Sequence, residues 1–154
     1  MKKIFSLFTL VILLTNCGFK VVNNKELKSF DIIEVNTFGE SRISFNLKNS
    51  LKDSNIDKNR KIKLNLNTKK IKEIKEKNIK NEITKYLIIL DTKVEYELVG
   101  ENKRGEFSIS KKGNYNVRKQ YSQTLINEKN LISSLTSELI EEIINNLVLS
   151  VNDL

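Results

Sequence analysis

Hydrophobic and polar residues alternate most clearly between residues 86 and 98. One face of this segment carries Tyr86, Ile88, Leu90, Thr92, Val94, Tyr96 and Leu98. The opposite face begins with Leu87 and Ile89 and then becomes charged. A period of two residues is typical of a β-strand, so this segment predicts a strand packed on both faces at its start and on one face later.

Three further segments predict strands. Residues 30–35 are apolar and β-branched, and residues 61–67 alternate between apolar side chains and lysine or asparagine. Residues 100–105 predict a hairpin loop, and the return strand that follows carries Phe107 and Ile109, then Tyr115 and Val117. Between these pairs, residues 111–113 indicate a bulge or a turn. Residues 68–81 are rich in lysine and glutamate, and their pattern leaves a continued strand, a loop and a weak helix open.

Two segments have the spacing of amphipathic helices. Ser41 is a candidate N-cap, and the helix behind it should end near Asp53, where residues 53–55 have loop composition. Its apolar face carries Ile43, Leu47, Ser50 and Leu51. A second, long helix is expected from about Asn127 to Val151. Its apolar stripe comprises Leu131, Leu135, Leu139, Ile140, Ile143, Leu147 and Val151, and it is widened by Ile132, Ile144 and Val148.

In chain order the elements are β-α-β-β-β-α. This order predicts an α+β fold, in which a small mixed or antiparallel sheet of about four strands carries two helices packed on one face. The second face of the sheet would then be open. If it carried a large apolar patch, a partner or a ligand would be needed to cover that patch.

The first residues have the features of an export signal. Lys2 and Lys3 precede an apolar run over residues 4–14. This run is shorter than the roughly 20 residues that a membrane-spanning helix needs, but it has the length of a signal-peptide core. We therefore expect three parts: a signal peptide over residues 1–16, a tether over residues 17–28 and a single domain over residues 29–154.

Residues 14–17, Leu-Thr-Asn-Cys, resemble the lipobox of bacterial lipoproteins. Cleavage after Asn16 would leave Cys17 as the attachment site for a diacylglycerol thioether, and its free amine would take a further acyl chain such as palmitate. Asn16 departs from the usual Gly, Ala or Ser. The other interpretation is an ordinary secretory signal or anchor that contains a cysteine, but one unpaired thiol gives a secreted protein nothing. Because Gly18 and not an aspartate follows, enterobacterial sorting predicts the outer membrane, with the protein facing the periplasm.

The composition excludes several classes of catalytic and binding site. The chain has 27 basic and 19 acidic residues, no histidine and one cysteine. Without histidine there is no Ser-His or Cys-His pair and no imidazole metal ligand. The five glycines are scattered and form no phosphate loop. Acidic sets occur at Glu73 with Glu76 and at Glu138 with Glu141 and Glu142, and we interpret both as solvated faces. We expect that the protein is not an enzyme and that it binds no metal and no cofactor other than the lipid on Cys17.

The chain resembles the lipopolysaccharide-assembly lipoproteins of the LptE family. The resemblance includes Cys17-Gly18-Phe19 and the first strand leading into the helix at Ser41-Arg42. It also includes the long hairpin over residues 87–117 with Tyr115 on its return strand. The final helix matches at Leu135, Leu139, Ile140, Ile143 and Leu147. Two features are off-pattern: the proline that commonly follows Cys-Gly-Phe is absent, and residues 68–81 are unusually rich in lysine.

The resemblance implies a binding role without catalysis. Such a protein plugs the β-barrel translocon LptD as a heterodimer, helps it fold and contacts lipopolysaccharide. A basic domain favours that phosphorylated ligand. The candidate contacts to lipopolysaccharide or barrel are Lys69, Lys70, Lys103, Arg104, Lys111, Lys112 and Arg118, with the predicted hairpin loop as the best cluster. The alternative is a free periplasmic lipoprotein that binds an anionic envelope ligand such as peptidoglycan. Nucleic acid is disfavoured by the expected location and by the lack of aromatic residues among the basic clusters.

Overall fold

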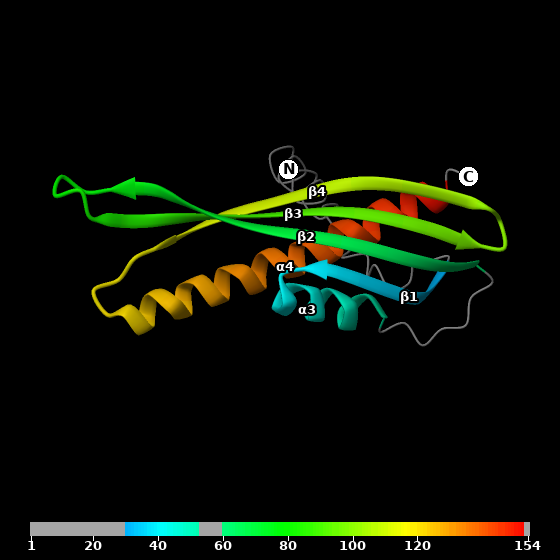
Figure 1. Ribbon diagram of the computed structural model, residues 1–154, viewed down its shortest axis with the longest axis horizontal. Helices are drawn as coiled ribbons and strands as arrows, with labels where there is room; N and C mark the ends of the chain where they lie inside the picture. Colours follow the sequence, from blue (N-terminus) through cyan, green and yellow to red (C-terminus); the bar gives the residue numbers. More distant parts are fainter. Residues whose placement is uncertain (1–29, 53–59, 153–154) are drawn as a thin grey trace, which may run out of the picture.

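The computed structural model describes residues 30–52 and 60–152 (Figure 1). The expected signal peptide, Cys17, the tether and the loop at residues 53–55 lie outside the described residues. Six elements follow one another along the chain. They are β1 (Phe30–Gly39), α3 (Ser41–Lys52), β2 (Arg60–Lys77), β3 (Ile83–Val99), β4 (Lys103–Asn116) and α4 (Tyr121–Asn152).

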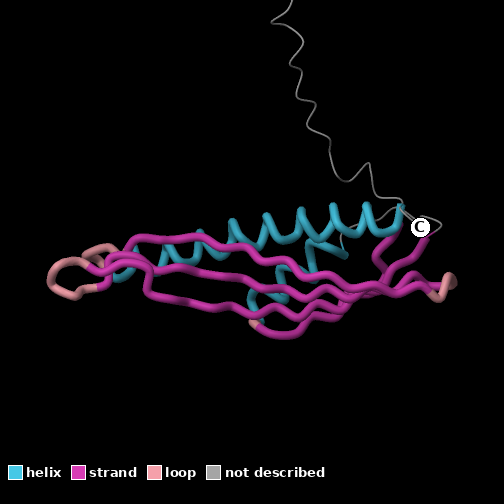
Figure 2. Tube along the Cα trace, turned by 90° about the horizontal axis from the view of Figure 1, so that it is seen from above, coloured by secondary structure: helices cyan, strands magenta, loops and turns pink. Residues whose placement is uncertain are grey.

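The strands form one mixed sheet in the order β1-β2-β3-β4. β1 runs parallel to β2, whereas β2, β3 and β4 are successively antiparallel. Figure 2 shows α4 along one side of this sheet, and α3 contributes Ile43 and Leu47 to the same core, so both helices cover the same face. The observed order and the placement of both helices confirm the predicted α+β fold.

The sequence pattern left the structure of residues 68–81 open, and in the fold most of this segment belongs to β2. β2 continues through Lys77 because β3 pairs with it nearly to its end, from Lys61 opposite Val99 to Lys77 opposite Ile83. The turn that follows is built on Asn78, whose side-chain oxygen accepts the backbone N–H groups of Lys80 and Glu82, each at 2.9 Å. Pairing with β3, and not intrinsic propensity, therefore decides the structure of this lysine-rich stretch.

Several predicted boundaries were wrong. The β3–β4 turn is shorter than the predicted loop, so Lys103 and Arg104 belong to β4. Residues 111–113 pair in continuous register with β3 and form neither a bulge nor a turn, because residues on both sides keep the same one-to-one pairing. The final helix begins six residues before Asn127, at Tyr121.

The first turn of α3 also differs from expectation. The carbonyl of Glu40 accepts the N–H of Ser44 at 2.9 Å, which makes Glu40, not Ser41, the N-cap residue. Ser44 is buried and Ser50 is exposed. Ser44 lies one position after Ile43 and three before Leu47, so the buried face of the helix includes it, and its hydroxyl donates to the carbonyl of Phe38 at 3.4 Å.

The core lies between the sheet and the two helices. Its members are fully or almost fully buried: Phe30, Ile32, Val35, Ile43, Leu47, Leu51, Ile62, Leu64, Leu66, Ile88, Leu90, Val94, Leu98, Ile109, Tyr115, Leu135, Leu139, Ile143, Leu147 and Val151. At one end of the core, Arg60 donates to the carbonyl of Val151 at 2.8 Å. This bond supplies a partner for one of the last carbonyls of α4 and joins the helix to the start of β2.

The face of the sheet that no helix covers is mainly polar. Its central residues on β2 and β3 include Lys63, Asn65, Lys93 and Glu95. The half-buried residues Ile71, Leu87 and Ile89 form a small apolar island beside them. Over the described residues this open face therefore presents no broad apolar surface that would require a partner to cover it.

Candidate functional site

The seven predicted basic contact residues do not form one cluster. Pairing within the sheet places Lys69, Arg104 and Lys112 on the open face. Lys70 and Lys111 are both paired with Leu90, a core residue, and Lys103 is paired with Leu98, so these three lie on the face that carries the helices. Arg118 lies in the connection between β4 and α4.

Four of the seven are engaged in ion pairs. Lys70 lies 3.1 Å from Glu40, Lys103 lies 3.8 Å from Glu101 and Arg104 lies 3.0 Å from Glu97. Lys111 pairs with Glu142 of α4, and this hydrogen bond raises the pKa of the lysine. Lys69, Lys112 and Arg118 make no ion pair with any described residue, so they are the more available cations of the predicted set.

A polar cluster that the sequence pattern did not reveal joins β2 to α4. The ammonium of Lys72 lies 2.7 Å from Glu128 Oε2, and the hydroxyl of Tyr115 donates to the same oxygen at 2.6 Å. The ammonium also lies 4.5 Å from the ring centre of Tyr86, within the range of a cation–π interaction. The rings of Tyr86 and Tyr115 stack with their centres 5.6 Å apart.

The protonation states of this cluster are mutually reinforcing. Burial is the largest single influence and opposes the charges of Lys72 and Glu128. The hydrogen bonds and charges within the cluster together outweigh it, so the pKa of Lys72 rises to about 12 and that of Glu128 falls. Burial and the bond to Glu128 together raise the pKa of Tyr115 to about 12. Around neutral pH the cluster is therefore an ammonium, a carboxylate and a neutral phenol, which suits a clasp between a strand and a helix.

The alternation along β2 could have placed Lys72 on the core-facing side, but the sequence pattern did not show how far that alternation extends. Lys72 is on the core-facing side of β2 only if the alternation at Ile62, Leu64 and Leu66 continues through the lysine-rich stretch. Because that stretch could not be assigned, the side of Lys72 could not be assigned either.

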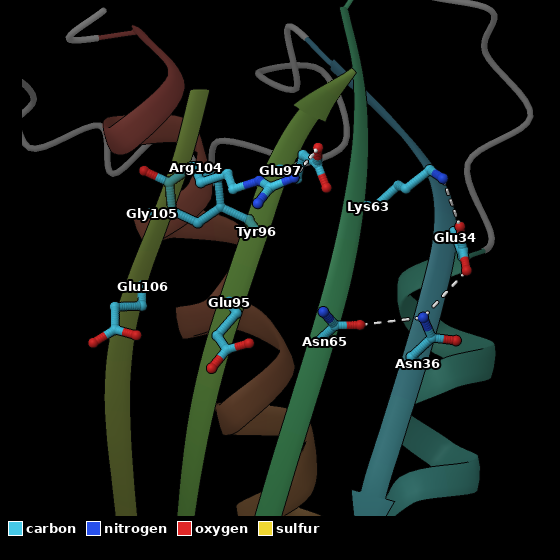
Figure 3. A pocket seen from close by; sticks show the side chains of 10 residues that line it. All are labelled: Glu34, Asn36, Lys63, Asn65, Glu95, Tyr96, Glu97, Arg104, Gly105 and Glu106. Atoms are coloured by element: carbon cyan, nitrogen blue, oxygen red, sulfur yellow. Dashed lines mark hydrogen bonds and ion pairs between the residues drawn. The ribbon is translucent and has the colours of Figure 1, made fainter. Parts of the chain in front are cut away.

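A shallow depression of about 570 Å³ lies near the β3–β4 turn (Figure 3). It is lined by Glu34, Asn36, Lys63, Asn65, Glu95, Tyr96, Glu97, Arg104, Gly105 and Glu106. Lys63 lies 3.1 Å from Glu34, and this hydrogen bond is the main cause of the lowered pKa of Glu34. Arg104 is paired to Glu97 as well, and the lining carries four glutamates against two basic residues, so the depression does not present a cationic surface.

Three members of the acidic sets of the sequence have polar partners within the fold. Glu76 pairs with Lys85 at 2.8 Å and Glu142 with Lys111, while Glu138 accepts from Ser134 at 3.3 Å. Within residues 30–52 and 60–152 there is no group of three or more acidic residues arranged to hold a metal ion. No helix in the same ranges is long and apolar enough to cross a membrane.

Comparisons with known proteins place the fold. No protein-family model matches the chain, and no curated protein sequence matches it. Solved structures, in contrast, match its fold. Rare lipoprotein B from Shewanella oneidensis superimposes with a TM-score of 0.59 and 10% identity, over 78% of this chain and 97% of that one. An uncharacterized lipoprotein B from Nitrosomonas europaea gives a TM-score of 0.57 and 10% identity, over 88% and 93%. At this identity the likeness shows a shared fold.

Proposed function

We propose that this chain is a lipid-anchored outer-membrane protein on the periplasmic side that acts as the plug and assembly partner of an LptD-like barrel. In this role it helps insert lipopolysaccharide into the outer leaflet, without catalysis and without a cofactor beyond the lipid on Cys17. The proposal rests on two features that occur in the same chain. A lipobox-like sequence at residues 14–17 precedes a domain whose fold is shared with structures of lipoproteins.

The open face of the sheet supports a place inside a barrel. The lumen of an outer-membrane barrel is polar, and the uncovered face of this sheet carries charged residues, asparagine and serine from all four strands. Such a surface can exchange bonds to water for bonds to a polar wall without leaving apolar area in water.

Lipopolysaccharide offers phosphates to basic side chains. Lys103 and Arg104 are weaker candidates than the sequence suggested, because a phosphate would have to displace Glu101 or Glu97. Lys69, Lys112 and Arg118 require no such exchange.

Extraction of the native membrane in mild detergent tests the proposed partner. A tag at the C-terminus of the full chain should recover a large barrel in equal amount. Recovery of the lipidated chain alone would contradict the plug function. The mass of the mature N-terminus tests the anchor separately, since cleavage after Asn16 and acylation of Cys17 give a defined product. A Cys17→Ser chain is the control, and its mass should lack the acyl groups.

The alternative is a free lipoprotein that binds an anionic envelope ligand. It is favoured by Lys69, Lys112 and Arg118, the predicted contacts that make no ion pair with a described residue. Retention of the chain on immobilised lipopolysaccharide and on peptidoglycan distinguishes the two ligands. Lys69→Glu with Lys112→Glu should weaken retention on the true ligand more than Lys103→Glu with Arg104→Glu. Equal effects of the two double variants would remove these residues from the site.

A further inference from the structure

Half of the exposed large apolar side chains of the described chain lie at one end of the molecule. Figures 1 and 2 show the β2–β3 turn and the start of α4 at this same end. We name residues 74–85 and 116–126 the tip surface. Its exposed large apolar members are Ile74 (51% exposed), Ile79 (103%), Tyr121 (73%), Leu125 (47%) and Ile126 (48%). Ile79 sits on the turn itself and contacts almost nothing in the chain.

The tip surface is also the basic end of the domain. It contains six basic residues and two acidic ones, Glu76 and Glu82. Among the basic residues, Lys75, Lys80, Arg118 and Lys119 have no ion-pair partner among the residues described. The first turn of α4, which carries no acidic residue, adds the positive end of the helix dipole.

A lysine-rich composition does not account for this asymmetry. The β3–β4 hairpin at the other end, over residues 93–106, has three basic and four acidic residues. All four glutamates there form ion pairs: Glu95 and Glu106 with Lys93, Glu97 with Arg104, and Glu101 with Arg60. The same chain therefore balances its charges at one hairpin and leaves them unbalanced at the other.

We propose that the tip surface docks onto a lipid bilayer that carries anionic headgroups, with Ile79 and Tyr121 entering the interface and the unpaired cations contacting the headgroups. Exposed aliphatic and aromatic side chains surrounded by lysine and arginine are typical of surfaces that lie in a membrane interface. A protein partner fits less well, because lysine is depleted from protein–protein interfaces. A small ligand also fits less well, because such ligands bind in concave sites and Ile79 projects from a turn.

This inference is independent of the proposed barrel partner and of the lipid anchor. β1 begins opposite the start of β2, and the 18 residues of β2 lead away from that point to the tip surface. At about 3.3 Å per residue, the strand places the tip roughly 60 Å from the first residue of the domain. The tip surface therefore lies at the end of the domain away from Phe30, and it would be an attachment separate from an acylated Cys17.

Vesicle binding of the chain without its anchor tests the inference. Residues 18–154 retain every member of the core and carry no acyl chain. They should float with vesicles of phosphatidylcholine and phosphatidylglycerol and not with vesicles of phosphatidylcholine alone. Ile79→Ser and Lys80→Glu should each lower the partition coefficient on the order of fivefold or more, since one basic residue near such a surface contributes about that factor.

Matched controls lie away from the tip. Phe45→Ser removes an apolar side chain that is 65% exposed on α3, and Lys61→Glu makes the same charge change at an exposed position near the start of β2. Both should bind like the unaltered chain. Because the chain contains no tryptophan, the indole of Ile79→Trp reports insertion directly. Its emission should shift to the blue with anionic vesicles, while that of Phe45→Trp should not.

Three results would overturn the inference. The first is no binding to anionic vesicles, which would favour a protein partner. The second is an equal loss in the tip variants and their controls, which would indicate attraction by net charge alone. The third is a tip-dependent change in the molecular mass of the chain in solution without vesicle binding, which would make a second copy the occupant.

Discussion

Lys72 and Glu128 are 56 residues apart in the chain and 2.7 Å apart in the fold. Of the two side-chain hydrogen bonds described between β2 and α4, this one lies nearer the β2–β3 turn. Tyr115 of β4 donates to the same carboxylate, so one glutamate holds groups from two strands. Loosening this clasp should free the far end of the hairpin before it affects the core.

Removal of the charge of Glu128 should therefore destabilise the domain. We expect Glu128→Gln to lower the free energy of unfolding by about 1 kcal/mol. This is less than the roughly 1.5–3 kcal/mol typical of hydrogen bonds to charged groups, because Lys72 is 39% exposed and solvent screens the pair. Urea unfolding measures this change. Lys93→Met, at a more exposed ion pair (48%), is the control and should have a much smaller effect. An equal effect of the two variants would contradict the clasp.

The same cluster predicts a stability plateau between acid and alkali. The pKa of Glu128 is lowered in the folded state from its ordinary value of 4.5, so its contribution is present above that value and is lost as the pH falls below it. The pKa values of Lys72 and Tyr115 are raised from 10.5 and 10.0 to about 12. Their contributions are therefore present below about pH 10 and are lost as the pH rises toward 12. Melting temperatures over this range test both limits.

The difference between the unaltered chain and Glu128→Gln isolates the cluster from other titrating groups. This difference should be constant between pH 6 and 9 (roughly the span between the ordinary pKa values) and should shrink on either side. A difference that did not change with pH would show that the variant acts through packing and not through charge.

The sequence predicted the elements whose period was undisturbed. Ile88, Leu90 and Val94 on β3, and Leu135, Leu139 and Ile143 on α4, are buried as their spacing required. From such segments the order of elements and the fold class followed correctly. The predicted element boundaries were wrong where pairing with a neighbouring strand, and not the local pattern, decides the structure. Glu76 and Lys77 have no strand-forming pattern of their own, and β3 recruits them through backbone pairing.

The candidate site was less predictable than the fold, for a physical reason. A basic side chain is available to a ligand only if no carboxylate within the fold neutralises it, and such pairs join distant segments. Lys111 meets Glu142, and Arg104 meets Glu97 across a strand pair. Sequence spacing revealed neither contact, so the sequence ranked the hairpin cluster first without knowledge of the ion pairs that engage it in the fold.

The buried hydroxyls of Thr68 and Thr92 provide a test of polar pairing inside the core. They lie 2.9 Å apart on β2 and β3 and are almost inaccessible to solvent. Thr68→Val alone should cost about 1–3 kcal/mol, because Thr92 then keeps a buried hydroxyl without a partner. The double variant with Thr92→Val should return to within about 1 kcal/mol of the unaltered chain, since both polar groups are gone. Additive losses, measured by urea unfolding in a double-mutant cycle, would show that the pair does not act as a unit.

Gly39, at the end of β1, should tolerate no side chain. Its φ is +103°, and a Cβ placed on it would lie 1.9 Å from the carbonyl oxygen of Thr68 on β2. Gly39→Ala must therefore bear both backbone strain and a collision with the neighbouring strand. Gly100→Ala is the matched control, because Gly100 has a φ of +90° with no atom within 4 Å of its Cβ position. Strain alone costs about 1–3 kcal/mol, so we expect Gly100→Ala to lose that amount and Gly39→Ala to lose clearly more. Hydrogen exchange should show the excess in the amides that pair β1 with β2. Equal losses would mean that the β1–β2 pairing yields without cost and that only the backbone conformation requires glycine.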